Sequence, residues 1–257
     1  MTMASLTHTL ERSLVIRAPR EVVFRYFTDD ERFARWWGEG STIDAKIGGE
    51  VRIQYPGGVV MKGEVLALQQ DHSIAFSYGY ENSHPELPPG SSRVTITLEE
   101  HAEGTSVKLV HELPSEKMRD AHVPGWRYHM AVFANVVTHF HHERIEETVD
   151  RWFEAWAEAD VARRGELLEA CTTEDVSVND PYACFAGRDE LVGHITNTLV
   201  HMPGVVMRRD GDVLQCQGAI LFEWAAKGPD GLRIAEGKNV ARLAPDGRIA
   251  AVRGFVG

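Results

Sequence analysis

The sequence predicts two α+β domains in tandem, over residues 1–146 and 147–257. The chain of 257 residues is longer than one ordinary small domain and suits two of about 100–150 residues each. In the first half, strands with alternating apolar side chains precede a long helix, whereas in the second half the helices come first and the strands last. In either order a curved sheet has to bury its concave face against helices, so each half is expected to form its own core.

The first half begins with a strand over residues 10–17 and a helix from Pro19, a residue that suits the first turn of a helix. A second short helix is expected over residues 31–37, and a long one from Gly125. This order predicts a helix-grip fold, in which an antiparallel sheet wraps around the long C-terminal helix. Between the helices, apolar side chains alternate in four strands: Val51, Ile53 and Tyr55; Ile74, Phe76, Tyr78 and Tyr80; Val94, Ile96 and Leu98; Val107, Leu109 and Leu113.

The second half begins with helical stretches that carry Trp152 and Trp156 on one side. A strand over residues 176–179 then meets Asp180, another helix follows, and four antiparallel strands complete the chain. This order predicts a cone-shaped α+β barrel with helices first and a curved antiparallel sheet last. No glycine or proline occurs over residues 126–164, so we expect the domains to meet within nearly continuous helix.

The net charge of −11 is spread evenly over the two halves. Residues 1–146 hold 15 Lys and Arg against 20 Asp and Glu, and residues 147–257 hold 12 against 18. Neither half offers the basic field that nucleic acids or anionic membranes require, which argues against both as partners. The chain has no apolar run of membrane-spanning length and no export signal at its N-terminus, so a cytoplasmic protein is expected.

The residue types that often bind metals or react give no strong pattern. His139, His141 and His142 lie beside Glu143, but no second ligand pair has a matching spacing, so we expect solvated helix surface there. His111, His122 and His129 are scattered in the same way. The three cysteines, Cys171, Cys184 and Cys216, include no C-x-x-C pair and are interpreted as small core or pocket residues. We therefore expect neither a metal nor another cofactor.

Several motifs of the first half occur in the order typical of a known family. They are Ala18-Pro19 before Val22-Val23-Phe24, Arg35-Trp36-Trp37, residues 93–99 with Gly104-Thr105, and Gly125-Trp126. Residues 8 to about 145 thereby resemble the heat-shock ATPase activator homologue family of the START-like (SRPBCC) superfamily. That resemblance implies a cup for an apolar ligand or a contact with a chaperone. The side chains that would line the cup, which also suit a plain core, are Trp37, Phe76, Tyr78, Trp126 and Met130.

The second half carries motifs of another group. They are Trp152 to Asp160, Val178-Asn179-Asp180-Pro181 with Gly187, and Asp246-Gly247-Arg248-Ile249. Residues 147–257 thereby resemble the SnoaL-like group of the nuclear transport factor two superfamily, which includes polyketide cyclases, ketosteroid isomerases and epoxide hydrolases. SnoaL-like cones often pair through their sheets, so by analogy the resemblance suggests a homodimer.

The resemblance to the isomerases implies a catalytic trio. In those enzymes a carboxylate removes a proton next to a carbonyl, and two hydrogen-bond donors stabilise the enolate. Asp180 stands at the position of the base, Trp152 at that of a donor tyrosine and Asn239 at that of a protonated aspartate. Trp and Asn can donate hydrogen bonds but lack the acidity of the groups they replace. Isomerase activity is therefore expected to be weakened if it exists.

Structural roles are the alternatives for these residues. An Asp-Pro pair commonly caps a turn, and Trp152 and Trp156 fit the core of an amphipathic helix. Asn239 shares an apolar face with alternate residues from Ala235 to Leu243, so its amide needs a partner. Ile220, Phe222 and Trp224 form an apolar wall where an epoxide hydrolase would hold a water molecule, so we set that activity aside. The expected ligand contacts of this domain are Trp156, Tyr182, Phe222 and Trp224.

Three functional hypotheses remain from the sequence. The preferred one is a protein that binds small apolar or aromatic molecules in cavities enclosed by its sheets. The second is an isomerase or cyclase that uses Asp180 as its base. The third is a chaperone-associated interaction module. The sequence names neither the ligand nor the oligomeric state.

Overall fold

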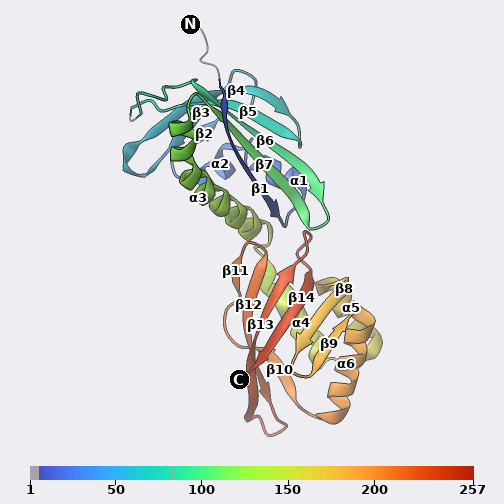
Figure 1. The fold of residues 1–257 in the computed structure, drawn as a ribbon. Helices are drawn as coiled ribbons and strands as arrows, with labels where there is room; N and C mark the ends of the chain where they lie inside the picture. Colours follow the sequence, from blue (N-terminus) through green and yellow to red (C-terminus); the bar gives the residue numbers. More distant parts are fainter. Residues whose placement is uncertain (1–5, 83) are drawn as a thin grey trace. The chain divides into compact units, whose positions relative to one another are not determined.

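The structure, a computed structural model that describes residues 6–82 and 84–257, divides into two compact units (Figure 1). The units are Met1–Thr138 and His139–Gly257, so the division falls in the last turn of a long helix, whereas the sequence analysis places the boundary after residue 146. Each unit combines helices with one sheet, which confirms the predicted α+β class. The nearly continuous helix is interrupted at residues 142–144.

The first unit contains one sheet of seven strands, ordered β1-β7-β6-β5-β4-β3-β2, in which all neighbours are antiparallel. This sheet and the long helix α3 confirm the predicted helix-grip fold. Its elements are β1 (His8–Ile16), α1 (Arg20–Arg25), α2 (Asp30–Trp37), β2 (Thr42–Ile43), β3 (Glu50–Gln54), a 3₁₀ turn (Pro56–Gly58), β4 (Val60–Gln69), β5 (Ser73–Tyr78), β6 (Ser92–His101), β7 (Gly104–Leu113) and α3 (Glu116–His141).

Helix α3 begins at Glu116, so the predicted start at Gly125 is wrong. Ser115 caps the helix, because its Oγ accepts a hydrogen bond from the backbone N–H of Met118 at 3.2 Å. Pro124 lies inside the helix, where the sequence suggested a helix boundary. The two additional turns bring His122 onto the same helix as Trp126 and His129, at spacings of four and three residues that place all three on one side.

The core of the first unit lies between the sheet and α3. The predicted alternation is confirmed, since the inward residues of β3, β5, β6 and β7 are almost completely buried. Phe133 of α3 lies at the centre of an aromatic cluster, with ring centroids 4.7 Å from Phe27 and 4.8 Å from Trp36. Aromatic side chains bury large apolar areas, so this cluster contributes much of the stability of the unit.

The second unit has helices first and a curved sheet last, as predicted, but the sheet is mixed. Its order is β10-β12-β13-β14-β8-β9, with β11 also paired to β12, and β14 runs parallel to β8. Five strands follow the last helix where four were predicted, because β10 and β11 each pair with a different part of β12. Its elements are α4 (Ile145–Ala157), α5 (Val161–Cys171), β8 (Thr172–Asp180), β9 (Ala183–Ala186), α6 (Arg188–His201), β10 (Val206–Arg209), β11 (Leu214–Cys216), β12 (Ala219–Lys227), β13 (Arg233–Leu243) and β14 (Ile249–Val256).

Two histidines of the predicted surface cluster are not surrounded by solvent. His142 is buried, and His141 Nε2 donates a hydrogen bond to the Pro245 carbonyl at 2.7 Å. These side chains pack on the β13–β14 turn, so the interpretation as solvated helix surface is wrong for them. Over residues 6–82 and 84–257, no group of three or more His, Cys, Asp or Glu side chains is arranged to hold a metal ion.

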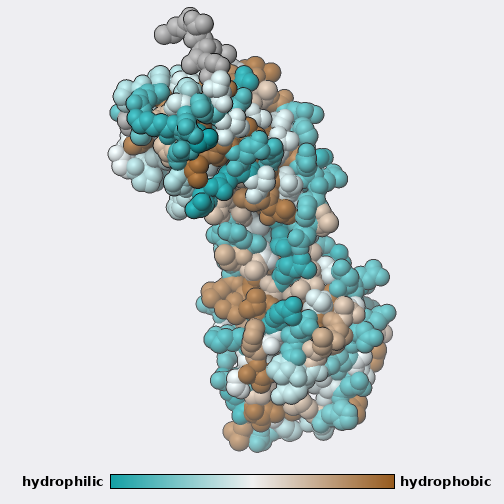
Figure 2. Space-filling view, in the orientation of Figure 1, coloured by the Kyte–Doolittle hydropathy of each residue, from teal (hydrophilic) through white to brown (hydrophobic). Residues whose placement is uncertain are grey.

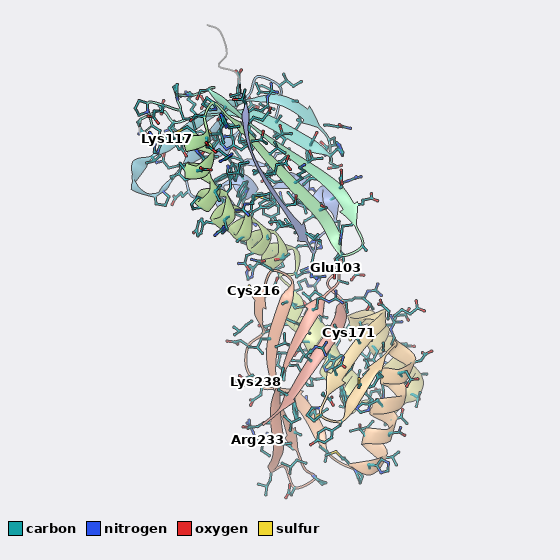
Figure 3. The ribbon with its side chains drawn as sticks, viewed as in Figure 1. Glu103, Lys117, Cys171, Cys216, Arg233 and Lys238 are labelled. Atoms are coloured by element: carbon teal, nitrogen blue, oxygen red, sulfur yellow. The ribbon has the colours of Figure 1, made fainter. Side chains whose placement is uncertain are left out.

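The cysteines differ in exposure more than predicted. Cys171, at the end of α5, is buried, and burial raises the pKa of its thiol to about 12. Cys184 and Cys216 are exposed, so they are not core residues; Figure 3 labels Cys171 and Cys216.

Hydrophobic and hydrophilic residues are interspersed on the visible face of each unit (Figure 2). No helix in the described part of the chain is long and apolar enough to cross a lipid bilayer.

Candidate functional site: two cavities of different character

The larger cavity belongs to the second unit and has a volume of about 620 Å³. It lies between the curved sheet and the helices α4 and α6, which all contribute side chains to its wall. Ligand cavities in proteins are usually a few hundred Å³ in size, so this one can enclose a small organic molecule. The predicted site residues that line it are Trp152, Trp156, Asp180, Tyr182, Trp224 and Asn239.

Strand register brings Asp180 and Asn239 to the same part of the cavity wall. Asn239 of β13 lies opposite Gly254 of β14, and the parallel neighbour of β14 is β8, which ends at Asp180. A Cβ atom on Gly254 would lie 2.9 Å from Asp180 Cβ and 3.1 Å from Asn239 Oδ1. A side chain at residue 254 would therefore fill the space between the carboxyl and amide groups, and glycine leaves that space open to the cavity.

Asp180 caps a turn, and its side chain also lines the cavity. Its Oδ1 accepts a hydrogen bond from the backbone N–H of Tyr182 at 2.7 Å, which is the turn-capping role. The same side chain lines the cavity and is only partly buried. A carboxylate offers two oxygens with several acceptor sites, so the turn leaves acceptor capacity for a ligand.

The tryptophans of α4 form the helical side of the wall. Trp152 is buried, and its ring centroid lies 6.0 Å from that of Trp156. Trp156 Nε1 is a buried donor with no hydrogen-bond partner among the described residues. The Trp156 ring also lies 5.7 Å from the ring of His194, at an interplanar angle of 80°. Unpaired buried donors are rare in proteins, so this indole N–H is a candidate contact for a polar ligand atom.

Phe222 does not line the cavity, although the sequence analysis proposed it as a ligand contact. It is completely buried, and its ring packs edge-on against Phe153 at 5.8 Å. Phe222 faces inward from the middle of β12, opposite Asn239, so its direction is as predicted. Its side chain fills the core beneath the cavity, whereas Trp224, two residues along the same face, reaches the wall.

Helix α6 supplies polar side chains that the sequence analysis missed. His194, Asn197, Thr198 and His201 all line the cavity, at spacings of three, one and three residues. That spacing keeps them on one side of a helix, and this pattern was the available signal. The buried Arg164 of α5 fixes the helix in place: its guanidinium donates to Thr196 Oγ1 at 2.5 Å and to the Glu158 carbonyl at 2.6 Å.

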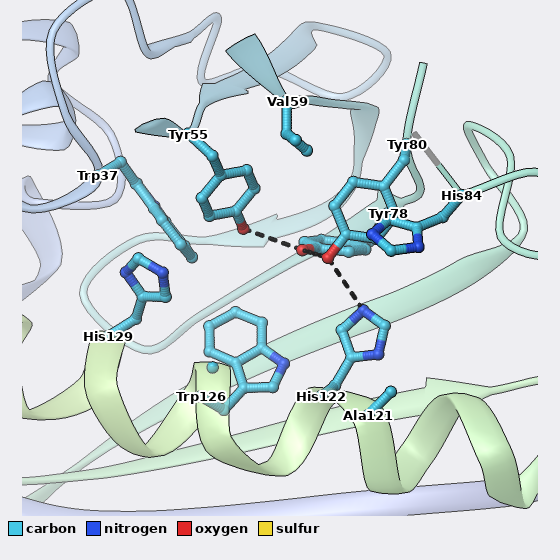
Figure 4. Close-up of a pocket in the computed structure, with 11 residues that line it drawn as sticks. Trp37, Tyr55, Val59, Tyr78, Tyr80, His84, Ala121, His122, Trp126 and His129 are labelled. Atoms are coloured by element: carbon cyan, nitrogen blue, oxygen red, sulfur yellow. Dashed lines mark hydrogen bonds between the residues drawn. The ribbon is translucent and has the colours of Figure 1, made fainter. Parts of the chain in front are cut away.

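The smaller cavity, of about 190 Å³, lies in the first unit between the sheet and α3 (Figure 4). Trp37, Tyr78 and Trp126 line it, as the sequence analysis expected of the cup. Phe76 and Met130 do not line it; they are buried in the core, which is the structural role weighed for them. The remaining wall residues are Tyr55, Val59, Tyr80, His84, Ala121, His122, Gly125 and His129.

His111 supports this cavity from within the core. The Trp126 indole N–H donates to His111 Nδ1 at 2.9 Å, so the proton of the neutral ring lies on Nε2, 2.9 Å from Ser92 Oγ. The Ser92 hydroxyl donates in turn to the Tyr78 carbonyl at 2.9 Å. Burial, together with the nearby His122, lowers the pKa of His111 well below its usual range. His111 is thus a neutral, fully paired structural histidine.

Three tyrosines and His122 form a continuous chain of hydrogen bonds across the cavity wall (Figure 4). The distances are 2.9 Å from Tyr55 Oη to Tyr78 Oη, 3.0 Å from Tyr78 Oη to Tyr80 Oη and 3.2 Å from Tyr80 Oη to His122 Nε2. Burial raises the pKa of all three phenols, so each keeps its proton at neutral pH. His111, His122 and His129, which are scattered in the sequence, come together in the fold, because β7 carries His111 and packs near α3, which carries the other two.

His129 and Trp37 complete the wall at the other end. Their rings lie 4.7 Å apart, and His129 Nδ1 and Trp37 Nε1 are both buried without a hydrogen-bond partner among the described residues. Burial lowers the pKa of His129 to about 4, so its ring is neutral at neutral pH. The smaller cavity is thus a polar site with no Asp, Glu, Lys or Arg side chain among the described residues of its wall, and some of its polar groups are hydrogen-bonded while others are not.

Comparisons with known proteins assign each unit separately. Residues 17–138 match the sequence profile described as Activator of Hsp90 ATPase homolog 1-like protein, and residues 149–252 match that of the SnoaL-like domain. A search of curated protein sequences gave no significant match.

Solved structures resemble one unit or the other. An AHSA1-like protein from Rhizobium etli is 30% identical, with 51% of this chain and 82% of that one covered and a TM-score of 0.42. A SnoaL-like family protein from Agrobacterium tumefaciens, described as a candidate isomerase, is 28% identical, with 46% and 98% covered and a TM-score of 0.42. The Aha1 dimer from Colwellia psychrerythraea is 16% identical, with 48% and 91% covered and a TM-score of 0.41. The chain therefore joins a domain of the Activator of Hsp90 ATPase homolog 1-like family to a SnoaL-like domain.

Proposed function

We propose that this protein binds small apolar or aromatic molecules, and that the cavity of the SnoaL-like domain is its main binding site. The observation that carries the proposal is a cavity of about 620 Å³ whose wall combines three tryptophans and several aliphatic side chains with a few polar groups. Such a composition favours burial of an apolar ligand, because each Å² of apolar surface removed from water contributes roughly 25 cal/mol. The polar groups Asp180, Asn239 and His194 would orient the bound molecule.

Filling the cavity tests this proposal. Ala235 lines the cavity from β13, whereas the neighbouring Glu236 is exposed on the other face of the strand. We expect Ala235→Trp to weaken binding of the neutral fluorescent probe N-phenyl-1-naphthylamine by at least about tenfold, which corresponds to about 1.4 kcal/mol. Glu236→Trp, which adds the same side chain to the outer face, is the matched control and should bind the probe normally. Equal probe affinities for the two variants would contradict the proposal.

A second candidate function is abstraction of a proton next to a carbonyl, as in an isomerase or cyclase. It is favoured by the position of Asp180 and Asn239 on either side of Gly254, where one ligand can contact both. Asp180 would act as the base, and Asn239 and the indoles of Trp152 and Trp156 would donate hydrogen bonds to the developing enolate. The Agrobacterium tumefaciens relative described as a candidate isomerase supports the same reaction class.

Two further expectations stay predictions. A homodimer would use the outer face of the second sheet, where Leu214, Val240 and Phe255 are exposed; light scattering of the purified chain tests it. A chaperone-associated role for the first domain is tested by measuring the ATPase rate of an Hsp90-type chaperone with and without this protein.

A further inference from the structure

The tyrosine chain of the first domain has a direction, which the bonds of His122 determine. His122 Nδ1 lies 2.7 Å from the Met118 carbonyl, an atom that can only accept, so Nδ1 carries a proton. Burial lowers the pKa of His122, so the ring is neutral and Nε2 is an acceptor. Tyr80 therefore donates its proton to His122 Nε2.

The other two tyrosines donate in the same direction. Tyr80 has used its proton, so its oxygen accepts from Tyr78, and Tyr78 in turn accepts from Tyr55. All three hydroxyl protons point toward His122. Among residues 6–82 and 84–257, the hydrogen-bond chain ends at Tyr55 Oη, which has no proton left to donate and retains a lone pair for one more hydrogen bond.

We propose that the first domain holds a second small-molecule site, for an uncharged ring-sized molecule whose O–H or N–H donates a hydrogen bond to Tyr55 Oη. The site is separate from the apolar cavity of the SnoaL-like domain and does not depend on the function proposed there. A cavity of about 190 Å³ admits one small ring, since cavities of roughly 150 Å³ bind benzene. Phenols fit this description: the ring would pack against the indoles of Trp37 and Trp126, and the hydroxyl would donate to Tyr55.

Unpaired polar atoms in the wall also favour a polar ligand over simple core packing. His129 Nδ1 and Trp37 Nε1 are buried and have no hydrogen-bond partner in the part of the chain that the structure describes, and both residues line the cavity beside Tyr55. The rings of Tyr55 and His129 lie 5.5 Å apart. No Asp, Glu, Lys or Arg side chain lines this cavity among the described residues. The pKa values of His111, His122 and His129 are lowered and those of the three tyrosines are raised, so these groups are neutral at neutral pH. A charged ligand would lose its hydration without gaining an opposite charge.

The test is a titration of the full chain with phenol and with anisole, which has the same ring but no hydroxyl proton. The six tryptophans report each site separately in ¹H–¹⁵N spectra of the indole N–H groups. Trp37 and Trp126 belong to this cavity, and Trp152, Trp156 and Trp224 belong to the other. We expect saturable shifts of the Trp37 and Trp126 signals, with phenol favoured over anisole. The absence of a saturable shift of these two signals would overturn the proposal. Shifts confined to the other three would also overturn it, and would place phenol in the SnoaL-like cavity instead.

Two variants test the hydrogen bond and the direction of the chain. Tyr55→Phe removes the acceptor, so the ratio of phenol to anisole affinity should fall roughly three- to tenfold. Tyr128→Phe, which changes an exposed tyrosine of the same domain, should leave the ratio unchanged.

Tyr80→Phe tests the direction of the hydrogen-bond chain. It removes the acceptor of the Tyr78 proton, so Tyr78 can donate to Tyr55 and the Tyr55 proton becomes available to the ligand. The ratio should then fall through tighter binding of anisole. An unchanged ratio in Tyr55→Phe or in Tyr80→Phe would overturn the assignment.

Discussion

In the first domain, the cavity is small, at about 190 Å³, and tyrosine and histidine side chains of its wall are hydrogen-bonded to one another. In the second domain, the cavity has a volume of about 620 Å³ and is mostly apolar. Its polar side chains Asp180 and Asn239 lie on either side of Gly254. Both cavities arise where a curved sheet meets helices. The same architecture can therefore leave either a small site lined by hydrogen-bonded polar groups or a larger, mostly apolar one, depending on which side chains occupy the inward positions.

The largest expected difference between the cavities is catalytic. If Asp180 is a general base, Asp180→Asn should reduce turnover of an enolisable ketone at least about 100-fold, because general-base catalysis typically contributes 10²–10⁴-fold. Binding of N-phenyl-1-naphthylamine should change little, since the substitution keeps the shape of the side chain. Asp175→Asn, an exposed position on the same strand, is the control for turnover. Full turnover in Asp180→Asn would remove the isomerase candidate and leave the binding function.

The next difference concerns the cores beneath the cavities. Phe133 of the first domain contacts Phe27, Trp36 and Tyr26, and we expect Phe133→Ala to lower the free energy of unfolding of that domain by about 3–5 kcal/mol. Urea unfolding followed by the indole signals of Trp36, Trp37 and Trp126 measures it. Tyr128→Ala, at an exposed position of the same helix, should cost less than about 1 kcal/mol. Comparable losses in both variants would show that the aromatic cluster is not central to the core.

The smallest expected difference is in the response to acid. Since the folded-state pKa of His129 is about 4, below the roughly 6.5 of an unfolded histidine, the unfolded chain takes up the proton first as the pH falls. This stabilisation is complete above about pH 6.5 and is lost progressively down to about pH 4. The titratable rings that lie against His129 among the described residues are those of Tyr128, at 5.1 Å, and Tyr55, at 5.5 Å. Burial raises the pKa of Tyr55, so its phenol stays protonated throughout.

His129→Gln should therefore reduce the loss of first-domain stability between pH 7 and pH 5, by about 1 kcal/mol after allowance for partial exposure. Unfolding in urea at the two pH values measures the change. His101→Gln, an exposed histidine of the same domain, is the control and should leave the pH dependence as it is. If both variants lose stability equally on acidification, the burial of His129 does not contribute to the acid response.

Much of the architecture follows from local patterns in the sequence. The alternation of Val51, Phe76, Ile96 and Leu109 determines which face of the first sheet is buried, because side chains alternate strictly along a strand. The same rule placed Asn239 on the inner face of β13. Helix α3 was predicted too short, since Pro124-Gly125 resembles a helix start and the cap at Ser115 was not recognised.

Contacts between distant residues could not be predicted in this way. The parallel pairing of β14 with β8 joins residues far apart in sequence, and only this pairing brings Asp180 next to Gly254 and Asn239. Likewise, the hydrogen bonds between Tyr80 and His122 and between Trp126 and His111 depend on how α3 packs on the sheet. Local sequence patterns were enough to predict two domains, the inward faces of their strands and the residue types available for chemistry. Tertiary structure decided which of those residues meet, because register and helix packing are settled by the whole core and not by any local pattern.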